Sequence, residues 1–207
     1  EEGGGGMKGS LIIVAFFVAG ACAGYLGLLD VSGLGVDVGF IALAALIFCV
    51  GIGIGHNIEG LKEELKGLGS RMLLLPLATI AGTLAGCAVV SLFLSSRSLS
   101  DVLAVGSGFG YYSLSSIFIS GYRGAELGTI ALLANIIREI ITLLGAPLLC
   151  RVFGPLAPVS AGGATSMDTT LPIIVATSGR RFTVLAVYHG FVVDFSVPFL
   201  VTLFCSF

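Results

Sequence analysis

The stretch SAGGATSMDTTLPII, residues 160–174, combines two adjacent glycines, a run of hydroxyl side chains, a proline and one carboxylate, Asp168. The sequence on both sides of it is strongly apolar. Backbone that leaves a helix inside a membrane is tolerated only where protein buries it or where it lines a cavity. The stretch therefore predicts a broken helix around an internal polar site.

The composition of the whole chain is that of an integral membrane protein. Of its 207 residues, 56% are hydrophobic and only 11% are charged, and the mean hydropathy is +1.09. A soluble domain carries about 25% charged residues. The net charge of −2 and the lack of a basic cluster give no indication of nucleic-acid binding. The five cysteines stand singly in apolar runs, so they predict neither a disulfide framework nor a zinc site.

Apolar runs long enough to span a bilayer need roughly 20 residues. We expect transmembrane helices at residues 10–29, 38–55, 71–95, 125–150 and 184–206. The opening EEGGGG, residues 1–6, resembles a linker or cloning remnant, so we assign a single transmembrane domain to residues 7–207.

Two further segments, 101–122 and 156–178, are long enough to span but are interrupted by glycines and hydroxyls. Gly162 lies 54 positions after Gly108, and the same offset places Ser115 on Thr169. This predicts an inverted repeat in which both segments are re-entrant hairpins that enter from opposite faces. The expected fold class is thus an all-α integral membrane protein with about five transmembrane helices plus two broken, re-entrant helical segments. Full crossing of both segments is the alternative.

The distribution of Lys and Arg gives an orientation. Loop 56–70 carries Lys62 and Lys66, whereas loop 30–37 carries only acidic charges. Because cytoplasmic loops are enriched in Lys and Arg, we expect a cytoplasmic N-terminus and an external C-terminus. The rule does not choose between re-entrant and fully crossing segments.

Four polar residues of helix 125–150 share one stripe: Asn135, Arg138, Glu139 and Thr142. A charge at mid-bilayer costs a few kcal/mol, so this stripe should face the protein interior. One interpretation is an internal ion pair that fixes this helix to a neighbour. The other, for Glu139, is a proton relay, because a buried carboxylate gains a proton readily.

Asp168 has no basic residue near it in sequence. Thr165 or Ser166 could cap a helix that starts after Gly162 and Gly163, which would place Asp168 in the first turn. A carboxylate there would stay ionised and would bind a cation. We therefore favour a functional role for Asp168 over a structural one.

The last helix carries His189 and Asp194, which lie on different faces. His189 is either a hydrogen-bonded packing residue or a proton carrier. Asp194 either pairs with Arg138 or caps a kink before Pro198. Tyr112, in the first broken segment, either lines the cavity or packs.

The motifs SGFGYYSLSS, NIIREII, GGATSMDTTLP and YHGF together resemble the C-terminal membrane domain of the bacterial lysine exporter family LysO, over nearly all of residues 10–207. The resemblance implies export of L-lysine and its toxic analogue thialysine across the inner membrane. It also implies that the acidic residue of the Ala-Thr-Ser-Met-Asp motif, here Asp168, is important. Full-length members carry further helices before this domain, so a small N-terminal-half membrane subunit or a homo-oligomer is an expected partner.

These observations predict a secondary transporter, not an enzyme, in the bacterial inner (plasma) membrane. Buried carboxylates would bind the lysine ammonium, and half-helix N-termini would bind its carboxylate. Export of a cation costs about 2.3 kcal/mol per charge for each 100 mV, so a driving ion must enter, a proton or alternatively sodium. The candidate substrate and proton site comprises Asp168, Glu139, Arg138, Asn135, Ser166, Thr169, Gly162, Gly163, Gly108, Gly110, Tyr112 and His189, without a metal or cofactor.

Three alternatives stay open. The chain is a non-autonomous subunit of a split exporter, or it exports another cationic amino acid. An intramembrane aspartyl protease with Asp168 and Asp194 as its dyad is disfavoured, because the Gly-x-Gly-Asp motif of such enzymes is absent.

Overall fold

The computed structural model describes residues 74–94 and 96–207, with isolated positions at 15–16, 18–20, 22–27, 48 and 52. The segment 1–6 and most of the expected helices 10–29 and 38–55 lie outside these residues. The described part is helical and holds no strand. Its elements are α4 (Leu75–Ser91), α5 (Leu99–Gly106), α6 (Tyr112–Arg123), α7 (Ala125–Phe153), α8 (Ala157–Gly162), the 3-10 helix η3 (Gly163–Met167), α9 (Leu171–Ser178), the short 3-10 turn η4 (Arg180–Phe182) and α10 (Thr183–Cys205).

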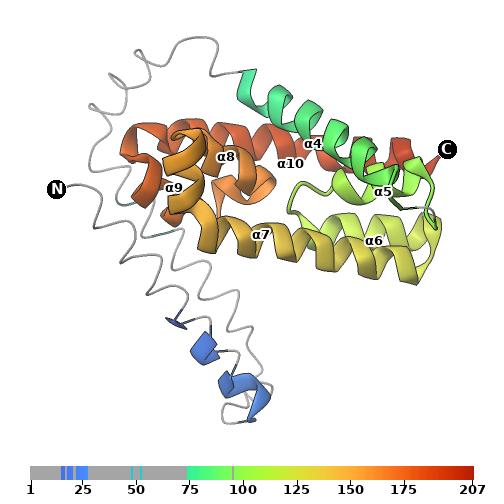
Figure 1. Cartoon of the computed structure of the whole chain (residues 1–207), viewed down its shortest axis with the longest axis horizontal. Coiled ribbons are helices and arrows are strands. Elements are labelled where there is room, and N and C mark those ends of the chain that lie inside the picture. Colours follow the sequence, from blue (N-terminus) through green and yellow to red (C-terminus); the bar gives the residue numbers. More distant parts are fainter. Residues whose placement is uncertain are drawn as a thin grey trace.

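Two long helices, α7 and α10, run the length of the described part in opposite directions (Figure 1). They confirm that residues 125–150 and 184–206 are helical. The helix expected at 71–95 is shorter in the structure, where α4 spans Leu75–Ser91. By length and composition, α7 and the segment formed by η4 and α10 are able to cross a membrane.

The outward faces of these helices are apolar. Only 28% of the apolar window of α7 and 39% of that of η4 and α10 is buried inside the molecule. On α10, Phe191, Phe195 and Phe199 expose 64%, 64% and 62% of their surface. A core helix of a soluble protein buries such side chains, so this surface fits a lipid environment.

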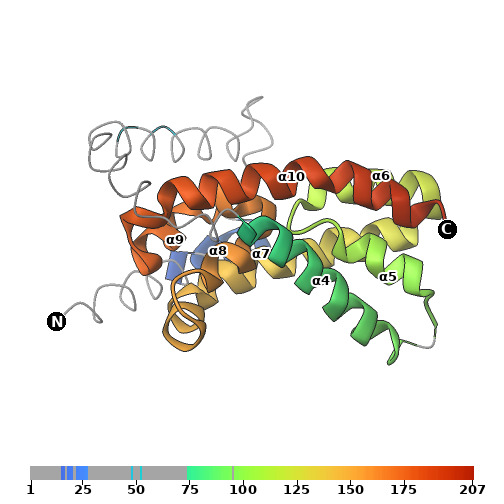
Figure 2. The same ribbon diagram turned by 90° about the horizontal axis from the view of Figure 1, so that it is seen from above.

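Both interrupted segments are broken helices, as the glycine clusters predict. α5 and α6 flank a break at residues 107–111, and α8 is followed by η3 and then α9. The outer ends of α5 and α6 lie at the end of the molecule that holds the C-terminus, whereas α8 and α9 lie toward the other end (Figure 1 and Figure 2).

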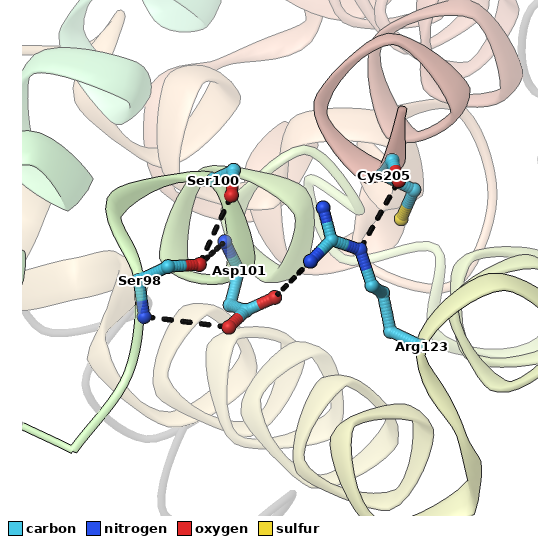
Figure 3. A network of polar contacts seen from close by, with 5 residues as sticks. All are labelled: Ser98, Ser100, Asp101, Arg123 and Cys205. Carbon is cyan, nitrogen blue, oxygen red and sulfur yellow. Dashed lines mark hydrogen bonds and ion pairs between the residues drawn. The ribbon is translucent and has the colours of Figure 1, made fainter. Parts of the chain in front are cut away.

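A polar network ties the elements together at the C-terminal end (Figure 3). Arg123, the last residue of α6, donates from Nη1 to Asp101 Oδ1 at 3.3 Å and from Nε to the Cys205 carbonyl at 3.1 Å. Ser98 and Asp101 form a capping box at the start of α5. The Arg97 and Glu126 side chains form a second ion pair. These contacts join the starts of α5 and α7 to the ends of α6 and α10.

The two breaks meet in the interior. The Ala164 N–H donates to the Phe109 carbonyl at 2.9 Å. A Cβ on Gly110 would lie 3.2 Å from the Gly162 carbonyl oxygen. A Cβ on Gly163 would overlap the Phe109 carbonyl oxygen. The main core surrounds this contact and is formed by Ala104, Phe109, Ile119, Leu127, Ala131, Ala164, Val193, Val197, Val201 and Cys205.

Candidate functional site

Asn135 of α7 holds the first break in place. Its buried side chain accepts the Gly110 N–H at 2.8 Å and donates to the Val105 carbonyl, near the end of α5, at 3.3 Å. A Cβ on Gly108 would lie 2.8 Å from Asn135 Cγ and 2.7 Å from Ser115 Oγ. Glycine at position 108 therefore allows the amide to approach the backbone.

Arg138, one turn further along α7, holds the second broken segment. It donates from Nε to the Ala161 carbonyl at 2.9 Å and from Nη2 to the Ser160 carbonyl at 3.1 Å. Its guanidinium also lies 5.9 Å from the centre of the Phe109 ring. A cation at the C-terminal end of a helix is stabilised by the partial negative charge of the free carbonyls, here those of α8.

The interpretation in which Arg138 forms an internal ion pair is wrong. In the part of the chain that the structure describes, the ion pairs are those of Arg97 and Arg123, and neither Glu139 nor Asp194 pairs with Arg138. Successive residues of a helix point about 100° apart, so the heads of residues 138 and 139 diverge although both lie on the predicted stripe. The carbonyls of α8 take the place of the expected carboxylate.

Glu139 lies about 100° around α7 from Arg138, near other acidic side chains. Its carboxylate interacts electrostatically with Asp168 and with the Thr169 side chain. The Tyr112 phenol interacts with both carboxylates, and Asp194 of α10 interacts with Asp168. We call Asp168, Glu139, Asp194 and Tyr112 the acidic cluster.

Asp168 itself is half-buried at the junction between η3 and α9. Its Oδ1 accepts the Thr169 N–H at 2.5 Å and the Thr169 hydroxyl at 3.3 Å. Thr169 therefore binds Asp168 directly, and its side chain also interacts with Glu139.

The predicted capping of Asp168's helix is wrong. Thr165 and Ser166 donate to the Gly162 and Gly163 carbonyls at 2.9 and 2.8 Å, and α9 starts only at Leu171, without a side-chain cap. The hydroxyls instead close the 3-10 turn, because Ser and Thr bond readily to the carbonyl three residues earlier. Asp168 thus precedes α9 and does not lie in its first turn.

His189 does not reach the acidic cluster by a hydrogen bond. Its ring is fully buried, with Nδ1 3.0 Å from Ser166 Oγ and Nε2 2.9 Å from Thr79 Oγ1. Thr79 Oγ1 is in turn 2.5 Å from Ser160 Oγ. The ring therefore links α10, η3 and α4.

A cavity of about 340 Å³ lies between α4, α5 and α7. Its walls are mainly apolar; Arg138 and Asn135 border it on one side, and Arg97 and Asp101 lie nearer the C-terminal end. It does not include the acidic cluster. Sequence reasoning missed its α4 side, Thr83 and Cys87, although with Thr79 they form an i, i+4, i+8 polar stripe that would have indicated an inward face.

Within residues 74–94 and 96–207, no group of His, Cys, Asp and Glu has metal-binding geometry. The carboxylates of Asp168 and Glu139 interact with the Tyr112 phenol, and Asp194 interacts with Asp168, so the acidic cluster attracts positive charge. Tyr112 directly follows the first break, and Asp168 lies between η3 and α9 in the second broken segment.

The lysine exporter LysO family model matches residues 14–205. The chain is 34% identical over 198 residues to a putative lysine exporter of Haemophilus influenzae, covering 96% of both chains. It is 33% identical over 164 residues to the lysine exporter LysO of Escherichia coli, covering 79% of this chain and 54% of that relative. The match therefore spans about half the length of the Escherichia coli protein. No solved structure matches the chain.

Proposed function

The chain belongs to the lysine exporter family LysO, whose members are transporters rather than enzymes, and we propose that it exports L-lysine through the centre where its two broken segments meet. The observation that carries this proposal is the acidic cluster. Its carboxylates come from α7, α10 and the η3–α9 junction, and those of Glu139 and Asp168 interact with Tyr112 at the start of α6.

We propose a membrane arrangement of about five transmembrane helices with two re-entrant hairpins, α5–α6 and α8–α9, as an inverted repeat. Their approach from opposite ends of the bundle supports this arrangement (Figure 1). The excess of Lys and Arg in loop 56–70 supports a cytoplasmic N-terminus and an external C-terminus in the inner membrane.

The substrate ammonium would bind Asp168 and Glu139, with Tyr112 as a hydrogen-bonding neighbour. The substrate carboxylate would bind free N–H groups at the start of α6, which begins beside the same cluster. Asn135 and Arg138 would hold the ends of α5 and α8 and thus shape the site. Thialysine carries the same charged groups and would follow the same path.

Coupling would use competition for one carboxylate. Lysine leaves against an inside-negative potential, so an inward-moving ion must drive it. A proton that binds Asp168 or Glu139 from outside would displace the substrate ammonium, which gives antiport. Sodium is the alternative ion, and a different cationic amino acid is the alternative substrate.

The chain would act alone or with a second membrane subunit. Lysine efflux from liposomes that contain the chain alone, compared with liposomes that also contain a co-purified small subunit, separates the two.

Asp168→Asn in such liposomes is the test of the proposed site. The amide has nearly the same size but cannot carry charge, so we expect lysine efflux to fall about tenfold or more, since a hydrogen bond to a charged group contributes about 1.5–3 kcal/mol. Glu126→Gln is the matched control, because Glu126 is exposed in an ion pair at the end of the bundle, and it should leave efflux unchanged. Normal efflux by well-inserted Asp168→Asn would refute the proposed site.

A further inference from the structure

The buried imidazole of His189 has a hydroxyl partner on each nitrogen. Ser166 Oγ lies 3.0 Å from Nδ1, and Thr79 Oγ1 lies 2.9 Å from Nε2. The side chain has no exposed surface. Each hydroxyl has one proton, so the network admits few arrangements of its hydrogens.

The surroundings of Ser166 decide which arrangement holds. Its hydroxyl lies 2.8 Å from the Gly163 carbonyl and 2.9 Å from the Ala186 carbonyl, and carbonyls only accept. If the Ser166 hydroxyl donated its hydrogen to His189, its lone pairs would face both carbonyl oxygens. Lone pairs and carbonyl oxygens repel each other, so this arrangement is unfavourable. The proton therefore goes to a carbonyl, and Ser166 Oγ accepts a hydrogen from Nδ1.

The other side of the ring follows from this assignment. A neutral imidazole with its hydrogen on Nδ1 has a lone pair on Nε2, which accepts the Thr79 hydroxyl. Thr79 Oγ1 then accepts from Ser160 Oγ. A second hydrogen on the ring would face the Thr79 hydroxyl hydrogen and would add a positive charge near Arg138, which interacts electrostatically with the ring.

The residue next to the histidine explains why this contact matters for the site. A Cβ on Gly190 would lie 2.6 Å from Met167 Cβ, 2.7 Å from Met167 N and 2.9 Å from the Ala164 carbonyl oxygen. Glycine at position 190 thus lets η3 pack directly on the α10 backbone. Asp168 follows Met167, so whatever holds η3 also holds this carboxylate.

We propose that His189 is a positioning residue that stays neutral with its hydrogen on Nδ1, clamps η3 between α4 and α10, and thereby fixes the Asp168 carboxylate. It is not a proton carrier. The importance of Asp168 rests on the proposed function, whereas the tautomer and the clamp rest on the contacts of the ring.

Nitrogen NMR tests the tautomer directly. The sequence has two histidines, so a His56→Gln protein labelled with ¹⁵N-histidine reports on His189 alone once its export activity has been verified. We expect a hydrogen-bearing Nδ1 and a bare Nε2 at every pH at which export operates, with and without lysine. A doubly protonated ring in that range, or the opposite tautomer, would overturn the proposal.

Export kinetics test the positioning role. His189→Asn keeps a donor near the Nδ1 position, so we expect it to retain more activity than His189→Ala, with a lower maximal rate and an unchanged pH profile. Ser166→Ala breaks the same clamp, so the double variant with His189→Ala should lose little more than the worse single variant. A displaced pH profile in His189→Asn, or fully additive losses, would contradict the clamp.

These results separate the two proposals. If Asp168→Asn exports normally but the ring is neutral with its hydrogen on Nδ1, the proposed site fails and the clamp stands as a structural feature. If the ring titrates during export while Asp168→Asn is inactive, the clamp fails and the proposed site stands.

Discussion

Gly163 stands where the two broken segments touch, and its backbone has a φ of +60°. A Cβ there would overlap the Phe109 carbonyl oxygen and lie 3.2 Å from Arg138 Nη2. We therefore expect Gly163→Ala to cost about 1–3 kcal/mol through overpacking, in addition to strain of about 1–3 kcal/mol from its backbone conformation. Thermal unfolding in detergent should show a clearly lower midpoint, and export should be lost.

Two other glycines separate these costs. Gly179 has a φ of +98° but open space where its Cβ would lie, so Gly179→Ala adds strain alone. Gly145 has open space and an ordinary helical φ, so Gly145→Ala should be neutral or slightly stabilising. If Gly163→Ala unfolds no more easily than Gly179→Ala, the close contact between the breaks is not tight.

At this scale the sequence predicted residue types better than their partners. The isolation of Asp168 in sequence and the position of Glu139 on an inward stripe pointed to the same site, and the two carboxylates interact electrostatically; their role in substrate binding stays a prediction. The partner of Arg138 was missed, because helical spacing gives the direction of a side chain but not the carbonyls that an unwound neighbour presents. The clamp by Ser166 was missed for the same reason, since its partner is distant in sequence.

Among the elements, α7 acts as a brace for both broken segments. Asn135 binds the break after α5, and Arg138 binds the last carbonyls of α8. Since the two residues lie one turn apart on the same helix, a shift of α7 would displace the hydrogen bonds to both broken segments together. This arrangement offers a physical link between the two halves during a transport cycle.

Hydrogen–deuterium exchange can resolve the two roles of α7. We expect Asn135→Ala to speed exchange at residues 107–112, and Arg138→Ala to speed it at residues 157–163, each about tenfold or more, because buried hydrogen bonds of about 1–3 kcal/mol are lost. Ile137→Ala is the control, since Ile137 lies between them on α7 and is 54% exposed. Equal acceleration in both regions by either variant would show that the brace does not act separately on each break.

The broken elements were predictable because glycine clusters and proline mark where helices stop, and both breaks fall at such clusters. The ends of α4 were predicted less well, because hydropathy alone does not locate helix ends. Proline favours the first turn of a helix, and α4 begins at Leu75, just before Pro76. The 3-10 turn η3 was not predicted. Its contacts with Phe109, Ala186 and His189 join residues far apart in sequence, which no local pattern reports.

The described part of the molecule, residues 74–94 and 96–207, has two differently charged ends. At the C-terminal end, Arg97 and Arg123 are each paired with a carboxylate. Arg180 and Arg181 precede α10 and so lie at the opposite end, where both are exposed. Since cytoplasmic loops are enriched in Lys and Arg, adjacent arginines at this end agree with the orientation expected from loop 56–70.

The topology that follows can be tested by cysteine labelling. In a background in which the five native cysteines are replaced, exposed positions give three single-cysteine proteins, Ser96→Cys, Ala125→Cys and Arg180→Cys. Ser96 precedes α5 and Ala125 follows α6, so re-entrant insertion of this hairpin places both on one side of the membrane. We expect an impermeant thiol reagent added to intact cells to label both, and to label Arg180→Cys only after the membrane is opened.

The labelling of Ser96→Cys compared with that of Ala125→Cys decides whether the α5–α6 segment is re-entrant or crosses the membrane. The counts of Lys and Arg do not distinguish these two arrangements. A span needs roughly 20 residues, whereas α5 and α6 are 8 and 12 residues long and turn back at the contact between Phe109 and Ala164. Each half-helix is therefore too short to cross alone, and their outer ends are tied together through Asp101 and Arg123. Labelling of the two positions from opposite sides would mean that this ion pair and the hairpin do not exist in the membrane, and the inverted repeat would fall with them.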